Sequence, residues 1–172
     1  MRVELDELIR TRRTQKAYEP GPVDRELLDE LFELARWAPT HHLTNPWRFR
    51  VLGPEALEAL KAAAGPESAS KLDRAPTLIA ASVLRSDDPV TDEEDFAAAA
   101  AATFIVLLGA HARGLGGYWR TPAVLRTPEG RAALGIPDEE RVLGLVHLGR
   151  AKGPDKLAPE RAPVDEIRAY LD

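Results

Sequence analysis

The sequence predicts a three-layer α+β fold around a small mixed sheet, as a single domain spanning residues 1–172. Three observations support this fold class. Helix-like and strand-like segments alternate along the chain. The apolar run Ala97–Ala110 has helical length and carries no charge, as expected of a buried helix. With 172 residues, the chain is long enough for one domain with a substantial core and too short to expect two.

The helices are predicted from apolar spacing and from the residues that start and stop them. Val23–Ala38 is amphipathic, with Asp24 as a suitable N-cap and Pro39 as its stop. The long apolar helix is expected to weaken at Gly109 and to end at Gly114. Further helices are expected at Val3–Thr11, at Pro54–Ala64, within Leu125–Gly135, and for a turn or two near Asp165–Tyr170.

Runs of apolar and β-branched residues predict three strands, at Trp47–Leu52, Thr77–Leu84 and Arg141–Leu148. Gly65–Ala75 is polar and predicts a loop or a short helix. Arg85–Glu94 is charged and contains proline, so we expect a loop there and the most mobile element of the chain. After the long helix, Gly114–Gly117 is expected to form a glycine-rich turn.

The composition disfavours several function classes. The chain has 23 Lys and Arg against 28 Asp and Glu, a net charge of −5, whereas nucleic-acid binding needs a basic face. Because there is no cysteine, any redox chemistry must come from a bound cofactor. Met1–Glu7 lacks the apolar core of a signal peptide, and Phe96–Ala110 is shorter than the roughly 20 residues of a membrane span. We therefore expect a cytoplasmic protein that does not bind membranes.

Two polar clusters suit a flat, phosphorylated ligand. The run Arg12-Arg13-Thr14-Gln15-Lys16 places three cations around one hydroxyl, and guanidinium groups form bidentate bonds to phosphate. The segment 114–121 offers bare backbone N–H groups, aromatic rings, a guanidinium and a hydroxyl. The alternatives are a solvated basic turn for the first cluster and a core helix with a tight exit turn for the second.

A third polar stretch, residues 40–46, carries two histidines and an asparagine. Adjacent histidines point opposite ways in a strand and no His-Glu-x-x-His helix is present, so we expect no metal site. The sequence lacks the Gly-x-Ser-x-Gly elbow of serine hydrolases and the phosphate loop of nucleotide triphosphatases. The glycines at 114–117 follow a helix instead of a strand, which disfavours a Rossmann fingerprint.

Taken in order, the motifs resemble the FMN-dependent nitroreductase family. They are Arg-Arg-Thr-x-Lys, Ala-Pro-Thr-His…Asn-Pro-Trp-Arg-Phe, Gly-Leu-Gly-Gly-Tyr-Trp-Arg-Thr and the last strand, Gly144–Gly149. The resemblance runs from Leu5 to about Ile167 and is closest to compact minimal members with a Gly-Gly-x-Trp-Arg turn. It implies a nitroreductase-like α+β fold, with a small, mainly antiparallel sheet flanked by helices and a long central interface helix. It also implies an obligate homodimer, one FMN per subunit at the interface, and NAD(P)H oxidation by a ping-pong mechanism.

The resemblance assigns roles to residues of the first cluster. Arg12, Arg13 and Thr14 would contact the FMN phosphate and ribityl chain, and Lys16 would lie near the flavin pyrimidine. A cation there favours reduced flavin, which carries negative charge. No catalytic side chain is implied, because hydride arrives at and leaves from the flavin itself. Three cations compete for a further phosphate contact: Arg150, Lys156 and Arg161.

The other two motifs would complete the site. From the partner subunit, Trp37 and His41 would reach the flavin, and Asn45 would lie close to the ring-binding part of the same loop. From the exit turn, three residues would close over the ring and phosphate: Trp119, Arg120 and Thr121. We expect the remaining aromatic and imidazole side chains to be ordinary core or surface residues, above all Trp47, His111 and His147.

The functional prediction is an oxidoreductase that uses FMN and NAD(P)H to reduce nitroaromatic, quinone or similar small electron-poor compounds. Two alternatives stay open. One is a flavin-binding protein without turnover, or a relative that fragments or dehalogenates its flavin or substrate. The other is a cofactor-free helical protein that dimerises through Ala97–Gly109.

Overall fold

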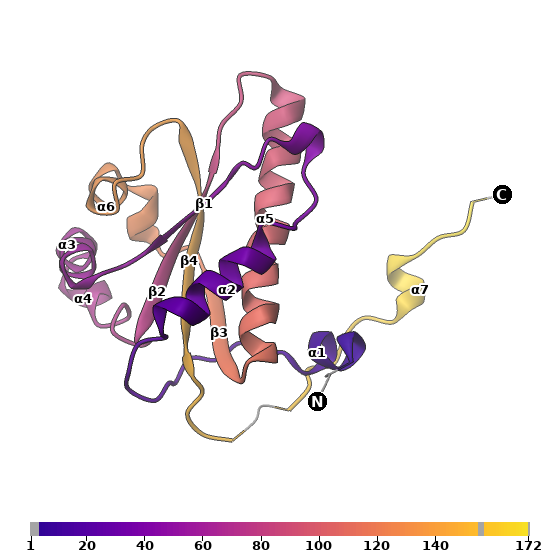
Figure 1. Ribbon diagram of the computed structural model, residues 1–172, viewed down its shortest axis with the longest axis horizontal. Helices are drawn as coiled ribbons and strands as arrows, with labels where there is room; N and C mark the ends of the chain where they lie inside the picture. The colour runs from indigo at the N-terminus through magenta and orange to yellow at the C-terminus, as the bar shows by residue number, and fades with distance from the viewer. Residues whose placement is uncertain (1–3, 155–156, 172) are drawn as a thin grey trace.

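The computed structural model describes residues 4–154 and 157–171. Its four strands pair only antiparallel, in the spatial order β1 (Trp47–Val51), β2 (Thr77–Leu84), β4 (Glu140–Arg150), β3 (Leu115–Arg120). One face is covered by α2 (Arg25–Ala35) and α5 (Pro89–Ala112), and the other by α3 (Pro54–Ala64), α4 (Pro66–Ala69) and α6 (Pro128–Ala133) (Figure 1). The three-layer α+β prediction is confirmed. The sequence predicted a mixed sheet. Among the described residues, the only parallel pairing is one isolated bridge, between Thr14 and Gly117.

Four smaller elements complete the chain: α1 (Leu5–Thr11), η1 (His41–Leu43), η2 (Ala123–Arg126) and α7 (Val164–Ile167). The first predicted helix begins at Leu5, and Val3 lies outside the described residues. The helix predicted to reach Ala38 ends at Ala35, because the next turn tightens and the Trp37 N–H donates to Leu34 O at 3.1 Å. The tail that carries α7 extends away from the rest of the chain (Figure 1).

The central helix starts earlier than the sequence predicted. Residues 85–94 were expected to form a mobile loop, but α5 begins at Pro89, so this prediction is wrong for 89–94. The side chain of Asp88 caps the helix by accepting from the Thr91 N–H at 2.9 Å and from the Thr91 hydroxyl at 2.7 Å. Asp followed by Pro at the first helical position is a recognised start signal, and the charged residues after it form the first exposed turns of α5.

The apolar part of α5 forms the centre of the molecule. Three of its six consecutive alanines, Ala98, Ala99 and Ala102, are buried within this chain. Farther along, a Cβ at Gly109 would lie 3.1 Å from the side chains of Leu31 and Leu34 of α2. By length and composition this helix could cross a membrane, yet half of its most apolar window is buried inside the protein. It is packed here as a core helix against both α2 and the sheet.

The predicted glycine-rich turn after α5 is mostly strand. Gly114, with φ of 75°, makes the turn, and Leu115 already begins β3, so the predicted turn over residues 114–117 is wrong. Tertiary packing explains the difference. A Cβ at Gly117 would lie 2.7 Å from Leu107 Cδ2, and one at Gly116 would lie 2.8 Å from Gln15 Cγ. These glycines therefore serve close packing on both faces of an edge strand instead of a turn.

A β-bulge interrupts the pairing of β4 with β2. Ala81 pairs with Gly144 and Ser82 pairs with Val142, so Leu143 is the extra residue. Its carbonyl accepts two side-chain hydrogen bonds from β3 and the residue after it, from Trp119 Nε1 at 3.3 Å and from Thr121 Oγ1 at 3.0 Å. The bulge thus fixes the far end of β3.

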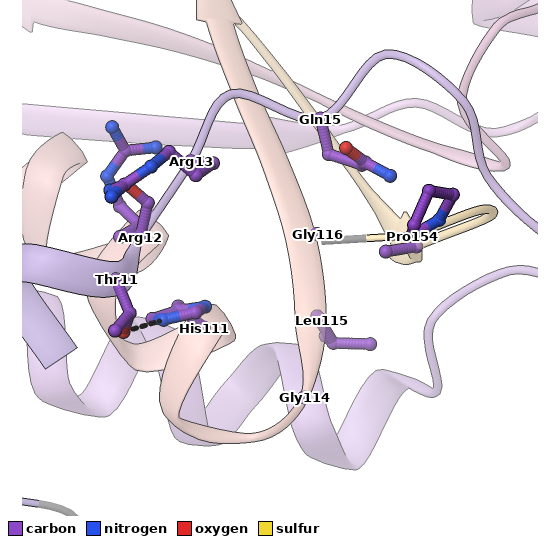
Figure 2. A pocket seen from close by; sticks show the side chains of 10 residues that line it. Thr11, Arg12, Arg13, Gln15, His111, Gly114, Leu115, Gly116 and Pro154 are labelled. Carbon is purple, nitrogen blue, oxygen red and sulfur yellow. Dashed lines mark hydrogen bonds between the residues drawn. The ribbon is translucent and has the colours of Figure 1, made fainter. Parts of the chain in front are cut away.

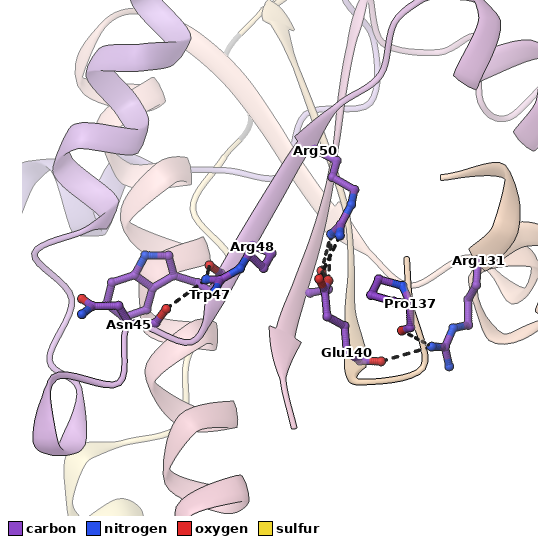
Figure 3. A network of polar contacts seen from close by, with 8 residues as sticks. Asn45, Trp47, Arg48, Arg50, Arg131, Pro137 and Glu140 are labelled. Atoms are coloured by element: carbon purple, nitrogen blue, oxygen red, sulfur yellow. Dashed lines mark hydrogen bonds and ion pairs between the residues drawn. The ribbon is translucent and has the colours of Figure 1, made fainter. Parts of the chain in front are cut away.

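An ion pair between Arg50 and Glu140 joins β1 to β4 (Figure 3), and a hydroxyl group of β2 bonds to the same carboxylate. Arg50 of β1 makes two 2.8 Å bonds to the carboxylate of Glu140 in β4, and the hydroxyl of Ser82 in β2 donates to the same carboxylate. Burial alone would raise the pKa of Glu140, but the hydrogen bonds from Arg50 and Ser82 outweigh it and lower that pKa. The buried carboxylate is therefore held in its charged form.

We predict that Arg50→Ala lowers the free energy of unfolding by about 3 kcal/mol, because it leaves the buried charge of Glu140 without its partner. Urea denaturation at pH 7 measures the change. Arg48→Ala is the comparison variant on the same strand: Arg48 is exposed, its side chain donates to the Asn45 and Trp47 carbonyls, and its charge is the last of the causes that lower the pKa of Glu140. It should cost less than about 1 kcal/mol. Equal losses in the two variants would contradict the proposed importance of the ion pair.

A second prediction concerns His147, which is 1 % exposed in β4. Burial, followed by the charges of Arg120 and Arg74, lowers its pKa from 6.5 to about 4. Between these values the unfolded chain binds a proton that the folded chain does not, so stability falls as pH falls. The loss should approach about 3 kcal/mol near pH 4. Unfolding curves from pH 7.5 to 4 for the wild type and for His147→Gln test this, since only the wild type should show this component of the slope.

Candidate functional site

The N-terminal segment builds a site against the edge of the sheet. After α1, Thr14 pairs with Gly117 of β3, and the Gln15 N–H donates to Gly117 O at 3.0 Å. The chain then passes to the end of β4, where Tyr18 pairs with Ala151. The predicted basic cluster is therefore held beside the start of β3 by backbone pairing, which fixes where its side chains lie.

A hollow of about 310 Å³ opens at this place (Figure 2). It is lined by residues of α1, the following segment, the end of α5 and the start of β3, including Thr11, Arg12, Arg13, Gln15, His111 and Gly116. Two arginines line it and no carboxylate does, among the residues that the structure describes. This donor set suits a phosphate group.

Among the described residues that line the hollow, the arginines have no carboxylate beside them. Burial is the first cause that lowers the pKa of Arg12, and the charges of Arg13 and Arg161 lower it further. Arg161 is thus the C-terminal cation whose charge acts on the cluster, while Lys156 lies outside the described residues. Arg13 is oriented by the backbone, donating to Arg10 O at 2.6 Å and to Arg12 O at 2.9 Å.

The outer edge of β3 continues from this hollow. Beyond Gly117, the described part of the chain pairs no strand with residues 118–120, so their outward backbone groups are open to a ligand. Lys16 is exposed beside this edge, with its Nζ 5.4 Å from the centre of the Tyr118 ring. A flat polar ring lying along the edge would meet both backbone groups and a cation.

The side chains of Trp119, Arg120 and Thr121 do not all point to one place, although the resemblance implied that the three residues close over the ring and phosphate. Trp119 packs against the core under α5, and its indole N–H already donates to Leu143 O. Arg120 points to the other face of the sheet, where its register partner Leu145 packs with Leu60 of α3 and Leu134 at the end of α6. Thr121 donates to Leu143 O as well. Around β3, the backbone of this motif is better placed for a ligand than the indole is.

The loop of the third predicted group lies at the opposite end of α5, whereas Trp37 follows Leu34, whose side chain lies beside Gly109 in the C-terminal half of that helix. Trp37 is 77 % exposed, and its Nε1 donates to Glu33 at 3.3 Å. His41 pairs with Glu94 at 2.8 Å, whereas Thr11 of the basic hollow bonds to His111 at 2.8 Å. Residues 94 and 111 belong to one helix, so at roughly 1.5 Å per residue they are about 25 Å apart. One chain alone therefore does not bring this loop to the basic hollow.

The loop itself has an unusual backbone. His42, Leu43 and Asn45 all have positive φ, at 49°, 55° and 47°, a region that costs free energy for non-glycine residues. Asn45 Nδ2 donates to Leu43 O at 2.7 Å. The Thr44 hydroxyl donates to the buried carboxylate of Asp95 in α5 at 2.5 Å. These bonds hold the loop in shape on the surface of α5.

Sequence reasoning missed several residues of the basic hollow. Gln15 lies inside the predicted motif but received no role, and Thr11 directly precedes it. His111 was expected to be an ordinary histidine, yet it lines the hollow. Its position one turn before Gly114 was the available signal, because a residue near the end of α5 faces whatever packs at the start of β3.

Comparison with known proteins matches this architecture. The family model of the nitroreductase family matches residues 9–68 and 65–150. YfhC of Bacillus subtilis (strain 168), named as a candidate NAD(P)H nitroreductase, is 27 % identical over 93 % of this chain and 90 % of its own length. A protein of Haemophilus influenzae with the same kind of name is 30 % identical over 92 % of this chain and 93 % of its own.

Among solved structures, the nitroreductase-like family protein from Bacillus cereus superposes with a TM-score of 0.89 at 22 % identity, covering 99 % of this chain and 97 % of that one. The nitroreductase NfnB from a Sphigopyxis strain, described as FMN- and NADPH-dependent, gives 0.80 at 19 % identity over 99 % and 100 %. At these identities the two structures support the fold alone. The family match extends over most of the chain, and so the protein belongs to the nitroreductase family and is an oxidoreductase.

Proposed function

We propose that this protein is an FMN-dependent oxidoreductase that uses NAD(P)H to reduce nitroaromatic, quinone or similar small electron-poor compounds. One observation carries the proposal: within the described residues, a hollow lined by two arginines and no carboxylate lies at the start of β3, whose outer edge pairs with no strand beyond Gly117. FMN combines a phosphate, a flexible ribityl chain and a flat polar ring, which match these parts in order. In this proposal the single domain covers residues 1–172 and is cytoplasmic.

The chain's own residues would hold the cofactor by charge and backbone contacts. Arg12 and Arg13, with Arg161 near them, would bind the phosphate, and Thr14 would contact the ribityl chain. Residues 119–121 would meet the ring with their backbone. Lys16 would add a positive charge beside the ring, which favours a ligand that becomes negative on reduction. Bound FMN would supply the hydride chemistry, accepting hydride from NAD(P)H and giving it to the oxidant in turn.

We further propose a homodimer in which the second copy completes each site. His41 lies about 25 Å along α5 from the Arg12 hollow of its own chain, Asn45 belongs to the same loop, and Trp37 is exposed on the segment that leads into it. A twofold arrangement would bring these three residues of one copy to the other copy's hollow. The exposed positions of α5, such as Ala97 and Phe104, lie between the two regions and offer an apolar surface for the contact.

The relatives support the choice of substrates. NfnB is described as dependent on FMN and NADPH. The 4-nitrobenzoate reductase of Pseudomonas putida shares 37 % identity over 62 residues, which is 36 % of this chain and 27 % of that enzyme. A nitroaromatic oxidant is therefore the first to try. Bleaching of the flavin absorbance by NAD(P)H distinguishes this proposal from a flavin carrier without turnover.

We predict that the purified protein takes up FMN and that Arg12→Ala weakens this binding by about 10- to 100-fold, the loss of one charge-assisted contact to phosphate. Quenching of FMN fluorescence in a titration measures the affinity. Arg10→Ala is the matched control, since Arg10 is exposed on α1, two residues before Arg12, and does not line the hollow. A wild-type protein that stays colourless with excess FMN would refute the proposed function.

We predict that mixing two impaired variants restores activity. Arg12→Ala and His41→Ala should each reduce NAD(P)H-driven turnover. In a mixed dimer the two changes fall on one site and leave the other intact, so random exchange should return about a quarter of wild-type activity. The assay is turnover before and after subunit exchange in mild denaturant. No gain on mixing, with exchange confirmed by mass spectrometry, would mean that each site belongs to one chain.

A further inference from the structure

A buried carboxylate in α5 lies under the loop that joins α2 to β1. Asp95 is 5 % exposed. Its position faces the core, because the residues three, four and seven positions later on the helix, Ala98, Ala99 and Ala102, are all buried. A carboxyl group at such a position is costly unless it is hydrogen-bonded, and an apolar side chain would avoid that cost. The reason for an acidic residue here is therefore expected in what the carboxylate binds.

The carboxylate binds the loop through its hydroxyl groups. Thr44 Oγ1 donates to Asp95 Oδ1 at 2.5 Å, and Thr40 Oγ1 lies 2.7 Å from Thr44 Oγ1. The two threonines flank η1, one on each side of it. A chain of hydrogen bonds thus joins both ends of this short turn to a single buried group of α5.

The conformation that these bonds hold is costly for the loop itself. His42, Leu43 and Asn45 have positive φ, a region that residues with a Cβ rarely adopt. Leu43 is 78 % exposed, so burial of its apolar side chain within the chain does not offset the cost. Backbone strain of this kind, held by a group in the rigid part of the fold, is typical of a preformed binding element.

The preceding residue of α5 orients the imidazole of the same loop. Glu94 Oε2 lies 2.8 Å from His41 Nδ1. A carboxylate only accepts hydrogen bonds, so the proton of this contact is on Nδ1. Nε2 is then the ring nitrogen left for a ligand. Two adjacent residues of α5 therefore fix the backbone of the loop and the direction of its first histidine.

We propose that Asp95 is a positioning residue. Through Thr44 it holds the loop of residues 40–45 in the shape that presents His41 of one copy to the ligand site of the other, while Glu94 sets the direction of the His41 ring. This inference rests on the proposed function, in which His41 acts at the second copy's Arg12 hollow. Asp95 touches neither substrate nor cofactor, so its whole effect passes through the loop.

The first experiment measures the loop in protein without FMN. Backbone NMR order parameters of His42, Leu43 and Asn45 should be about 0.85 in the wild type and fall below about 0.6 in Asp95→Ala and in Thr44→Val, which each remove one end of the bond. Thr44→Ser keeps the hydroxyl and should restore the wild-type values. Values that stay high in both Asp95→Ala and Thr44→Val would overturn the proposal.

The matched control is Glu93→Ala. Glu93 is an exposed carboxylate two residues before Asp95 on the same helix, and its removal should leave the order parameters unchanged. The amides of residues 12–16 serve as an internal reference, because they belong to the Arg12 hollow and should not respond to a change at Asp95. Equal loosening in Glu93→Ala and Asp95→Ala would contradict a specific role for Asp95.

Subunit exchange then identifies the site that Asp95 serves. Asp95→Ala should reduce NAD(P)H-driven turnover about tenfold, the cost of a misplaced binding element. Mixed with Arg12→Ala, it should return about a quarter of wild-type activity, because one site of the mixed dimer has an intact hollow and an intact loop. Mixed with His41→Ala, it should give no gain, because every site then has an altered loop. Asp95→Asn keeps an acceptor for Thr44 and should recover most of the turnover.

A purely structural role gives a different pattern. If Asp95→Ala only loosened the fold, its mixture with Arg12→Ala would hold no intact site and show no gain. If Asp95 acted along α5 on the hollow of its own chain, the gain would come with His41→Ala instead. Either pattern would overturn the proposal. If Asp95→Ala proves unfolded by thermal denaturation, Thr44→Val on the exposed loop takes its place in both mixtures, with the same expected pattern.

Failure of this inference can be distinguished from failure of the proposed function. If Arg12→Ala and His41→Ala show no gain when mixed with each other, the second-copy proposal is refuted, and the order parameters alone decide whether Asp95 holds the loop. If that pair gains activity and the Asp95→Ala mixtures do not follow the expected pattern, only the role of Asp95 is refuted. A protein that takes up no FMN refutes the flavin assignment and leaves the NMR test unaffected.

Discussion

The close approach of three chain segments at Gly116 and Gly117 is the constraint on which the basic site depends. On one face of β3, α5 comes so near that a Cβ on Gly117 would meet Leu107 at 2.7 Å. On the other face, Gln15 would meet a Cβ on Gly116 at 2.8 Å. Bare backbone on the edge strand therefore allows Thr14 to pair with Gly117. That pairing places the two arginines just before it at the start of the strand.

The length of α5 then divides the predicted site residues into two groups. Its C-terminal end holds the basic hollow, and its N-terminal half holds the loop with His41. The loop has three non-glycine residues at positive φ, and Trp37 just before it is largely exposed. Both features cost free energy in an isolated chain. A second copy that covers the loop would offset that cost, so the same helix that separates the groups within one chain explains why two chains would be needed.

Local signals predicted the layers well and the connections poorly. The strand at Thr77–Leu84 and the helix at Pro54–Ala64 were predicted with the correct bounds, because their apolar runs and flanking prolines and glycines are local. The start of α5 was not predicted, although Asp88 and Pro89 are typical of a helix start, because the charged residues around them are also typical of a loop. The strand at residues 115–117 could not be recognised locally, because its glycines are required by contacts with segments far away in the sequence.

The same distinction applies to the site. The basic cluster was found because three cations stand together in the sequence, whereas the part played by Arg161 depends on where the tail runs. The opposite orientations of Trp119 and Arg120 follow from strand alternation, which is hidden when the segment is taken as a turn. β3 is an edge strand, and its side chains differ from one residue to the next because successive residues point to opposite faces of the sheet. The bulge at Leu143 fastens the far end of β3 from the β4 side through Trp119 and Thr121, and the basic hollow lies at the start of the same strand. In a chain with a net charge of −5, arginines concentrated at the start of one strand are a local arrangement that anionic ligands would stabilise.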